Sequence, residues 1–194
     1  FTFRKATDVA TRKMLASVAK KEGFELDKGS TELLAILADG SFRNALGELQ
    51  KVLNFSKSKN VKIEDIESIT GAPQTTMVND FLSAIGKGEL EHGITVVQKA
   101  SSQSLDMRLF FKLIIAKFRI LVILKYAPKL QEEMAGDLSE SDMEFLKALV
   151  KEDKKGIFRS EALSILLEQY QNIDNAFITE LPLELALVKI LKQE

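Results

Sequence analysis

The sequence has no cysteine and no tryptophan, one histidine and three prolines among 194 residues. Without cysteine the chain cannot form a disulfide, a thiolate metal site or a cysteine nucleophile. The single histidine, His92, argues against a histidine-based metal centre or catalytic triad. The chain also has no large excess of either charge, since 27 Lys+Arg balance 28 Asp+Glu. Strong nonspecific nucleic-acid binding by overall charge is therefore not expected, although a local basic patch remains compatible with the composition.

Long hydrophobic runs are absent as well. The most apolar stretch, residues 109–124, contains Lys112, Lys117 and Arg119, and it is too short and too charged to span a membrane. We therefore expect no membrane partner. The N-terminus carries no basic region followed by an apolar one, so it does not resemble a signal peptide. Because the chain begins at Phe1 without a methionine, we expect it to be a fragment of a longer protein.

What the sequence does have is helical periodicity. Glycine and proline are scarce, strand-like alternation is nearly absent, and apolar residues recur at three- and four-residue steps, which predicts an all-α protein. Capping residues and apolar spacing predict a first block of helices over residues 8–22, 28–38, 42–53 and 63–69. A second block is predicted over residues 75–85, 90–100, 105–127, 141–151, 157–172 and 182–192.

Two domains are predicted, residues 1–72 and 73–194. The run Thr70-Gly71-Ala72-Pro73 is a strong stop after a complete four-helix block, because glycine ends helices and proline cannot continue them. In the second block, the long helix after Ser104 carries two neighbouring apolar stripes. A helix that is apolar on two stripes is expected at the centre of a helical bundle.

Few motifs carry chemistry. The sequence contains no GxxxxGK[ST], GxGxxG, HExxH or GxSxG pattern. The acidic pairs Glu132-Glu133 and Glu152-Asp153 lie among lysines, and we expect both to be solvated surface. His92 is expected to be a surface or capping histidine. A basic stripe of Arg108, Lys112 and Arg119 would either face an acidic partner helix or form a solvated edge of the bundle.

One short stretch, Asp39 to Leu46, is chemically unusual. Ser41 is a good N-cap, so Arg43 falls at the second position of the helix, where a cation opposes the helix dipole at a cost of about 0.3–1 kcal/mol. Arg43 also lies off the expected apolar stripe of Phe42, Ala45, Leu46, Leu49, Val52 and Leu53. A cation beside free backbone N–H groups suits a bound anion such as phosphate. The alternatives are that Arg43 pairs with Asp39 or is simply solvated.

The run Gly40-Ser41-Phe42-Arg43-Asn44-Ala45-Leu46, followed by Leu49 and Leu53, resembles the sensor 2 motif of AAA+ clamp-loader ATPases. Within that family, the similarity is greatest to the gamma/tau type of subunit of bacterial DNA polymerase III, specifically to its C-terminal lid and collar portion. Further segments resemble the same family in the same order along the chain: residues 1–5, 20–24, 69–71, 119–128 and 181–187.

The resemblance implies an AAA+ helical lid over residues 1–72 and a helical-bundle collar over residues 73–194, which would hold clamp-loader subunits in a ring of five. Arg43 would contact the nucleotide phosphates, with Ser41 and Phe42 close to the nucleotide. The implied cofactor is ATP with magnesium in the full-length protein, and none is expected to bind tightly to this chain alone, which should be inactive as an ATPase. The implied partners are other clamp-loader subunits, the sliding clamp and primed DNA, in the cytoplasm.

The sequence departs from the family at Asn44, where the family usually has aspartate, so charge on residue 44 cannot hold Arg43. Two alternatives remain at this point. The chain is similar to other clamp-loader subunits, such as a delta-prime or a replication-factor small subunit. It could instead be a helical scaffold without a nucleotide role, in which residues 40–46 are only a capped helix start.

Overall fold

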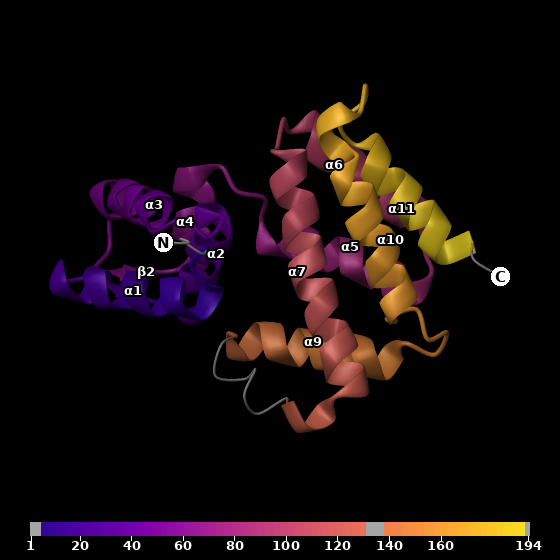
Figure 1. Cartoon of the computed structure of the whole chain (residues 1–194), viewed down its shortest axis with the longest axis horizontal. Coiled ribbons are helices and arrows are strands. Elements are labelled where there is room, and N and C mark those ends of the chain that lie inside the picture. Colours follow the sequence, from indigo (N-terminus) through magenta and orange to yellow (C-terminus); the bar gives the residue numbers. More distant parts are fainter. Residues whose placement is uncertain (1–4, 131–137, 193–194) are drawn as a thin grey trace. The chain divides into compact units, whose positions relative to one another are not determined.

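A computed structural model of the chain describes residues 5–130 and 138–192 (Figure 1). Ten α-helices account for most of the described residues, and the strands are confined to one two-residue pair. The prediction of an all-α fold is confirmed. No helix in the described part is long and apolar enough to cross a membrane.

The chain divides between Ala72 and Pro73 into two compact units. The first unit contains residues up to Ala72, with the short segment that ends at Ser139, and the second contains the rest. Gly71 ends the last helix of the first unit in the left-handed conformation, with φ 73°. Glycine adopts this conformation without the steric penalty that other residues meet, so the helix stops here.

The first unit is a four-helix cluster. It consists of α1 (Asp8–Lys21), α2 (Lys28–Ala38), α3 (Phe42–Phe55) and α4 (Ile63–Thr70). Side-chain oxygens cap three of the four helices: Thr7 accepts from the backbone N–H of Ala10, Asp27 from Ser30, and Ser41 from Asn44. One large side chain from each helix is buried at its centre, namely Leu15, Leu34, Leu49 and Ile66.

Two short strands in this unit were not predicted. β1 (Glu25–Leu26) and β2 (Asn60–Val61) pair in parallel, and the backbone N–H of Glu25 donates to the carbonyl of Lys59 at 2.8 Å. The buried hydroxyl of Ser30 donates to the carbonyl of Val61 at 3.2 Å. These contacts tie the connection before α2 to the connection before α4. Two residues are too few to show an alternating pattern, so periodicity could not reveal them.

The second unit is a helical bundle around α7 (Met107–Tyr126). α7 packs against α5 (Thr75–Lys87), α9 (Glu140–Glu152) and α10 (Ser160–Gln171), while α6 (Leu90–Ser102) packs against α5 and α11 (Leu181–Lys192) (Figure 1). Short 3₁₀ helices lie at Pro128–Leu130 and Ile173–Asn175. The two apolar stripes of α7 supply buried aromatic and aliphatic side chains, including Phe110, Phe111, Ile114, Phe118 and Leu121.

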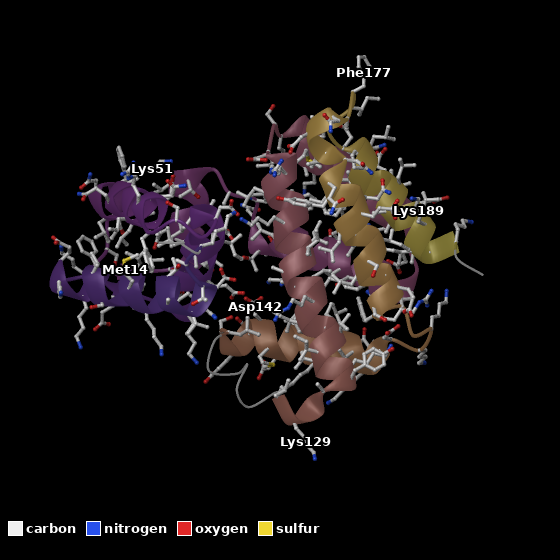
Figure 2. The ribbon with its side chains drawn as sticks, viewed as in Figure 1. Met14, Lys51, Lys129, Asp142, Phe177 and Lys189 are labelled. Atoms are coloured by element: carbon white, nitrogen blue, oxygen red, sulfur yellow. The ribbon has the colours of Figure 1, made fainter. Side chains whose placement is uncertain are left out.

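A buried ion pair links three helices of this bundle. The Nζ of Lys117 on α7 lies 2.6 Å from Oδ1 of Asp142 on α9, which Figure 2 labels, and donates to Oδ1 of Asn79 on α5 at 2.9 Å. The side chains of Lys117 and Asp142 are 11% and 8% exposed. Charges this well buried need partners, and here each satisfies the other.

The prediction that Glu152-Asp153 is solvated surface is wrong for Asp153, whose side chain is fully buried. Its carboxylate lies 2.7 Å from Nζ of Lys125 and accepts the backbone N–H groups of Ile157 and Phe158. Burial raises the pKa of the Asp153 carboxyl, but these hydrogen bonds outweigh it and hold the pKa below its ordinary value.

This carboxylate also explains why α10 begins at Ser160 rather than at residue 157, as predicted. The N–H groups of Ile157 and Phe158 are directed to Asp153 instead of into a helix, while both side chains are buried in the core. The second acidic pair, Glu132-Glu133, lies outside the described residues.

Candidate functional site at the start of α3

The turn between α2 and α3 is built from two successive left-handed residues. Asp39 has φ 50° and Gly40 has φ 75°. The chain reverses within these two residues, and the backbone N–H of Ser41 donates back to the carbonyl of Ala38 at 3.0 Å. Aspartate tolerates this region better than most residues, and glycine adopts it freely. The turn therefore places α3 immediately after α2 in a fixed direction.

Ser41 caps α3 as its residue type predicts. Its Oγ accepts the backbone N–H of Asn44 at 3.3 Å, and its carbonyl accepts the N–H of Ala45 at 2.9 Å. The N–H groups of Phe42 and Arg43 belong to the first turn, where a helix offers no acceptor of its own. The start of α3 thus presents two backbone donors at the positive end of a 14-residue helix.

Arg43 projects from this first turn into solvent. Its side chain is exposed, and within residues 5–130 and 138–192 it makes no hydrogen bond or ion pair. It does not pair with Asp39, whose Oδ2 lies 3.2 Å from Nζ of Lys5. Of the two alternatives to anion binding, pairing with Asp39 is therefore not what the structure contains, and Arg43 is solvated.

Phe42 and Leu46 are also uncovered, with 46% and 40% of their surface exposed. The prediction of one apolar stripe is wrong at these two positions. The buried face of α3 is formed by Ala45, Leu49 and Val52, and the other two side chains stand at its edge. Spacing alone does not show how wide a stripe the neighbouring helices cover. An exposed cation beside exposed apolar groups is suited to contact a further molecule.

The turn also has partners that sequence reasoning missed. The backbone N–H of Ala6 donates to the carbonyl of Gly40 at 3.0 Å, beside the Lys5–Asp39 pair. The segment before α1 therefore contacts the turn before α3, 34 residues away in the sequence. The only signal for this was Gly40 itself, since a glycine can mark close approach of two backbones.

The other charged residues discussed in the sequence analysis lie away from the start of α3. His92 is a surface histidine as predicted, with Nε2 2.9 Å from Oδ1 of Asp80. Arg108 pairs with Asp174 and stacks over the ring of Tyr170 at 5.3 Å, so its charge is used within its own unit. Arg119 is exposed. Among the described residues, no group of His, Asp and Glu side chains could hold a metal ion.

The groups at the start of α3 are those that suit a bound anion. Arg43 supplies a delocalised cation, and the first-turn N–H groups supply directed donors, which is the chemistry that holds phosphate at helix starts.

Comparison with known proteins identifies relatives of part of the chain. No family model matches the chain. It is 27% identical over 112 residues to DNA polymerase III subunit gamma/tau of Mycoplasma genitalium, a match over 58% of this chain and 19% of the relative. It is 30% identical over 97 residues to replication factor C small subunit of Thermoplasma volcanium, over 50% of this chain and 30% of the relative.

A solved structure shares the fold. The Bacillus subtilis DNA clamp loader delta protein superposes with a TM-score of 0.52 at 16% identity, over 98% of this chain and 58% of that chain. The matched residues span less than a third of the length of either curated relative. The resemblance recognised from sequence is confirmed, since homologues of the chain include gamma/tau subunits of DNA polymerase III.

Proposed function

We propose, from the premise that the chain is a homologue of DNA polymerase III gamma/tau subunits, that it is the lid and collar portion of a clamp-loader ATPase subunit. The first unit, up to Ala72, would be the AAA+ lid. The second unit, from Pro73, would be the collar that joins neighbouring subunits into a ring of five. A cytoplasmic location belongs to the same proposal.

Arg43 is the sensor 2 arginine in this proposal. In the intact subunit it would contact the phosphates of ATP from the lid, with Ser41 and Phe42 beside the nucleotide. The observation that carries this role is an exposed guanidinium without a partner among the described residues, at the start of a helix whose first N–H groups are free to donate. The magnesium–ATP complex would supply the reactive phosphate, and the residues of this chain would only bind and orient it.

Asn44 fits this role without adding charge. Its backbone N–H is taken by Ser41 and its side chain is exposed. Arg43 would therefore be positioned by the turn before it and by the helix itself, and not by a carboxylate at residue 44. This is a difference from the usual family pattern, and it makes the turn at Asp39 and Gly40 more important for positioning.

The collar role draws support from an apolar surface on the second unit. Leu185 and Val188 on α11 and Leu167 on α10 are between 37% and 46% exposed, and Phe177 in the connecting loop is fully exposed (Figure 2). Large exposed apolar side chains on neighbouring elements are typical of protein–protein interfaces. Other clamp-loader subunits are the proposed partners there, and the assembled ring would grip the sliding clamp and primed DNA.

A second candidate is a different kind of clamp-loader subunit. Similarity to a replication factor C small subunit and to the fold of a delta protein favours it. In that case the collar role stays the same, while the role of Arg43 depends on whether the subunit binds ATP.

Clamp loading by the intact subunit tests the proposal. Arg43→Ala should slow loading about ten- to a hundredfold, because a charge-assisted hydrogen bond to phosphate contributes about 1.5–3 kcal/mol. Lys13→Ala, which removes an exposed cation from α1 of the same unit, is the control and should load normally. Normal loading by the Arg43→Ala subunit, together with normal assembly, would remove Arg43 from the mechanism.

A further inference from the structure

We propose that Gly40 is a positioning residue, which lets the segment before α1 dock on the turn before α3 and so sets where Arg43 stands. The inference rests on the proposed role of Arg43 in binding ATP. Its consequence is that movement of the chain ahead of α1 is transmitted directly to the phosphate-binding turn, without passing through the core of the lid.

The contact between the two segments is made mainly by backbone. The N–H of Ala6 donates to the carbonyl of Gly40 at 3.0 Å. The accompanying Lys5–Asp39 ion pair spans 3.2 Å, but its side chains are 78% and 65% exposed. Exposed pairs of this kind contribute little because water screens them. The backbone hydrogen bond and the close packing around it therefore hold the segment in place.

Glycine is required at position 40 for two separate reasons. Its φ of 75° is strained for residues with a side chain. A Cβ at this position would also lie 3.1 Å from Cβ of Lys5 and 3.4 Å from the carbonyl oxygen of Ala6. The first of these is closer than Cβ contacts normally come, and it involves atoms next to the backbone. A side chain at residue 40 would therefore force Lys5 to shift by a few tenths of an ångström and would weaken the contact between the segment and the turn.

No residue separates the turn at Asp39 and Gly40 from the N-cap of α3. Gly40 is followed directly by Ser41, whose side chain and carbonyl together hold the first turn of α3. On the other side, Ala6 is followed by Thr7, the N-cap of α1. A displacement of the segment before α1 must therefore either carry the α3 start with it or break the Ala6–Gly40 hydrogen bond.

Gly40→Asn is the test, with Gly23→Asn as its matched control. Asparagine tolerates positive φ better than most residues, so the backbone strain is small and similar in the two variants. Gly23 follows α1 with φ 77°, and a Cβ at residue 23 would meet no other atom within 4 Å, whereas a Cβ at residue 40 would meet Lys5 and Ala6. The difference between the two variants therefore measures the effect of the steric contact between residue 40 and the segment before α1.

Amide hydrogen exchange on the chain gives the first readout. The Ala6 N–H should exchange at least about tenfold faster in Gly40→Asn, because its hydrogen bond to the carbonyl of residue 40 is weakened, and within about twofold of the wild-type rate in Gly23→Asn. Equal Ala6 exchange in Gly40→Asn and the wild type would overturn the inference, since the contact would then not depend on Gly40.

ATP affinity of the intact subunit gives the second readout. Gly40→Asn should weaken binding about tenfold, the lower end of the loss expected for Arg43→Ala, since it shifts Arg43 without removing its charge, and Gly23→Asn should not. Added to Arg43→Ala, Gly40→Asn should cause a smaller loss than it causes alone, because most of its effect acts through Arg43.

The failures are distinguishable. If Arg43→Ala weakens ATP binding and Gly40→Asn does not, or if the two losses add in the double variant, the inference is wrong while the proposed function stands. If Arg43→Ala leaves ATP binding unchanged, the proposed function fails and the inference fails with it.

Discussion

Replacement of Asp153 by asparagine is expected to destabilise the second unit by about 2–3 kcal/mol at pH 7. Breaking a buried ion pair typically costs about 3–5 kcal/mol. Lys125 is 21% exposed and can regain water, which lowers the expected loss. The asparagine keeps the shape of the side chain but has one acceptor oxygen for the three donors from Lys125, Ile157 and Phe158. Loosening these donors also loosens Phe158, which packs edge-on against Phe118.

The loss of unfolding free energy caused by Asp153→Asn should become smaller as the pH falls. The pKa of the Asp153 carboxyl is lower in the folded chain than its ordinary value, so the folded state favours the ionised form. The stability that Asp153 adds is therefore fully present above the unfolded pKa of about 3.9 and is lost as the pH falls through the folded pKa. The difference between wild type and Asp153→Asn should shrink below about pH 4.

Urea unfolding at pH 7, 5 and 3 measures both expectations. Asp174→Asn is the control, because Asp174 is 61% exposed in its pair with Arg108, and its replacement should change the unfolding free energy by less than about 1 kcal/mol. A loss below about 0.5 kcal/mol for Asp153→Asn, or a loss that stays constant down to pH 3, would refute the reasoning about this carboxylate.

Three further predictions concern the same chain. Lys117→Met should cost about 3–5 kcal/mol in urea unfolding because it removes the cation that lies 2.6 Å from the buried carboxylate of Asp142, and adding Asp142→Leu should recover much of the loss; no recovery would contradict the ion-pair account. Gly93→Ala should destabilise by about 1–3 kcal/mol, since its Cβ would lie 2.5 Å from Cδ2 of the fully buried Leu187, and an unchanged melting temperature would show that Leu187 can move aside. The purified chain alone should hydrolyse no ATP above background, because it lacks a P-loop, and measurable turnover would disprove this.

Much of the fold could be predicted because its signals are local. Ser41 is a capping residue by type, and it begins α3 as expected. Gly71 ends α4 where the sequence predicts a stop. Such features depend on neighbours three or four residues away, which a single sequence displays directly.

What could not be predicted depends on contacts between distant residues. Asp153 looks like a surface acid in the sequence, and only the folded chain brings Lys125 to it. Phe42 has the spacing of a core residue, yet 46% of its surface is exposed. In the candidate site, the position of Arg43 in the first turn of α3 could be predicted from the sequence. The contact of Ala6 with Gly40 could not.

Equilibrium ATP binding to the intact subunit tests the central claim most directly, since that claim is a contact between Arg43 and the nucleotide phosphates. Arg43→Ala should bind ATP about ten- to a hundredfold more weakly than the wild type. Arg43→Lys should fall between them, because lysine keeps the charge but loses the two-pronged geometry. Lys13→Ala should bind as the wild type does. Equal ATP affinity for wild type and Arg43→Ala, with both subunits folded to the same melting temperature, would contradict the account.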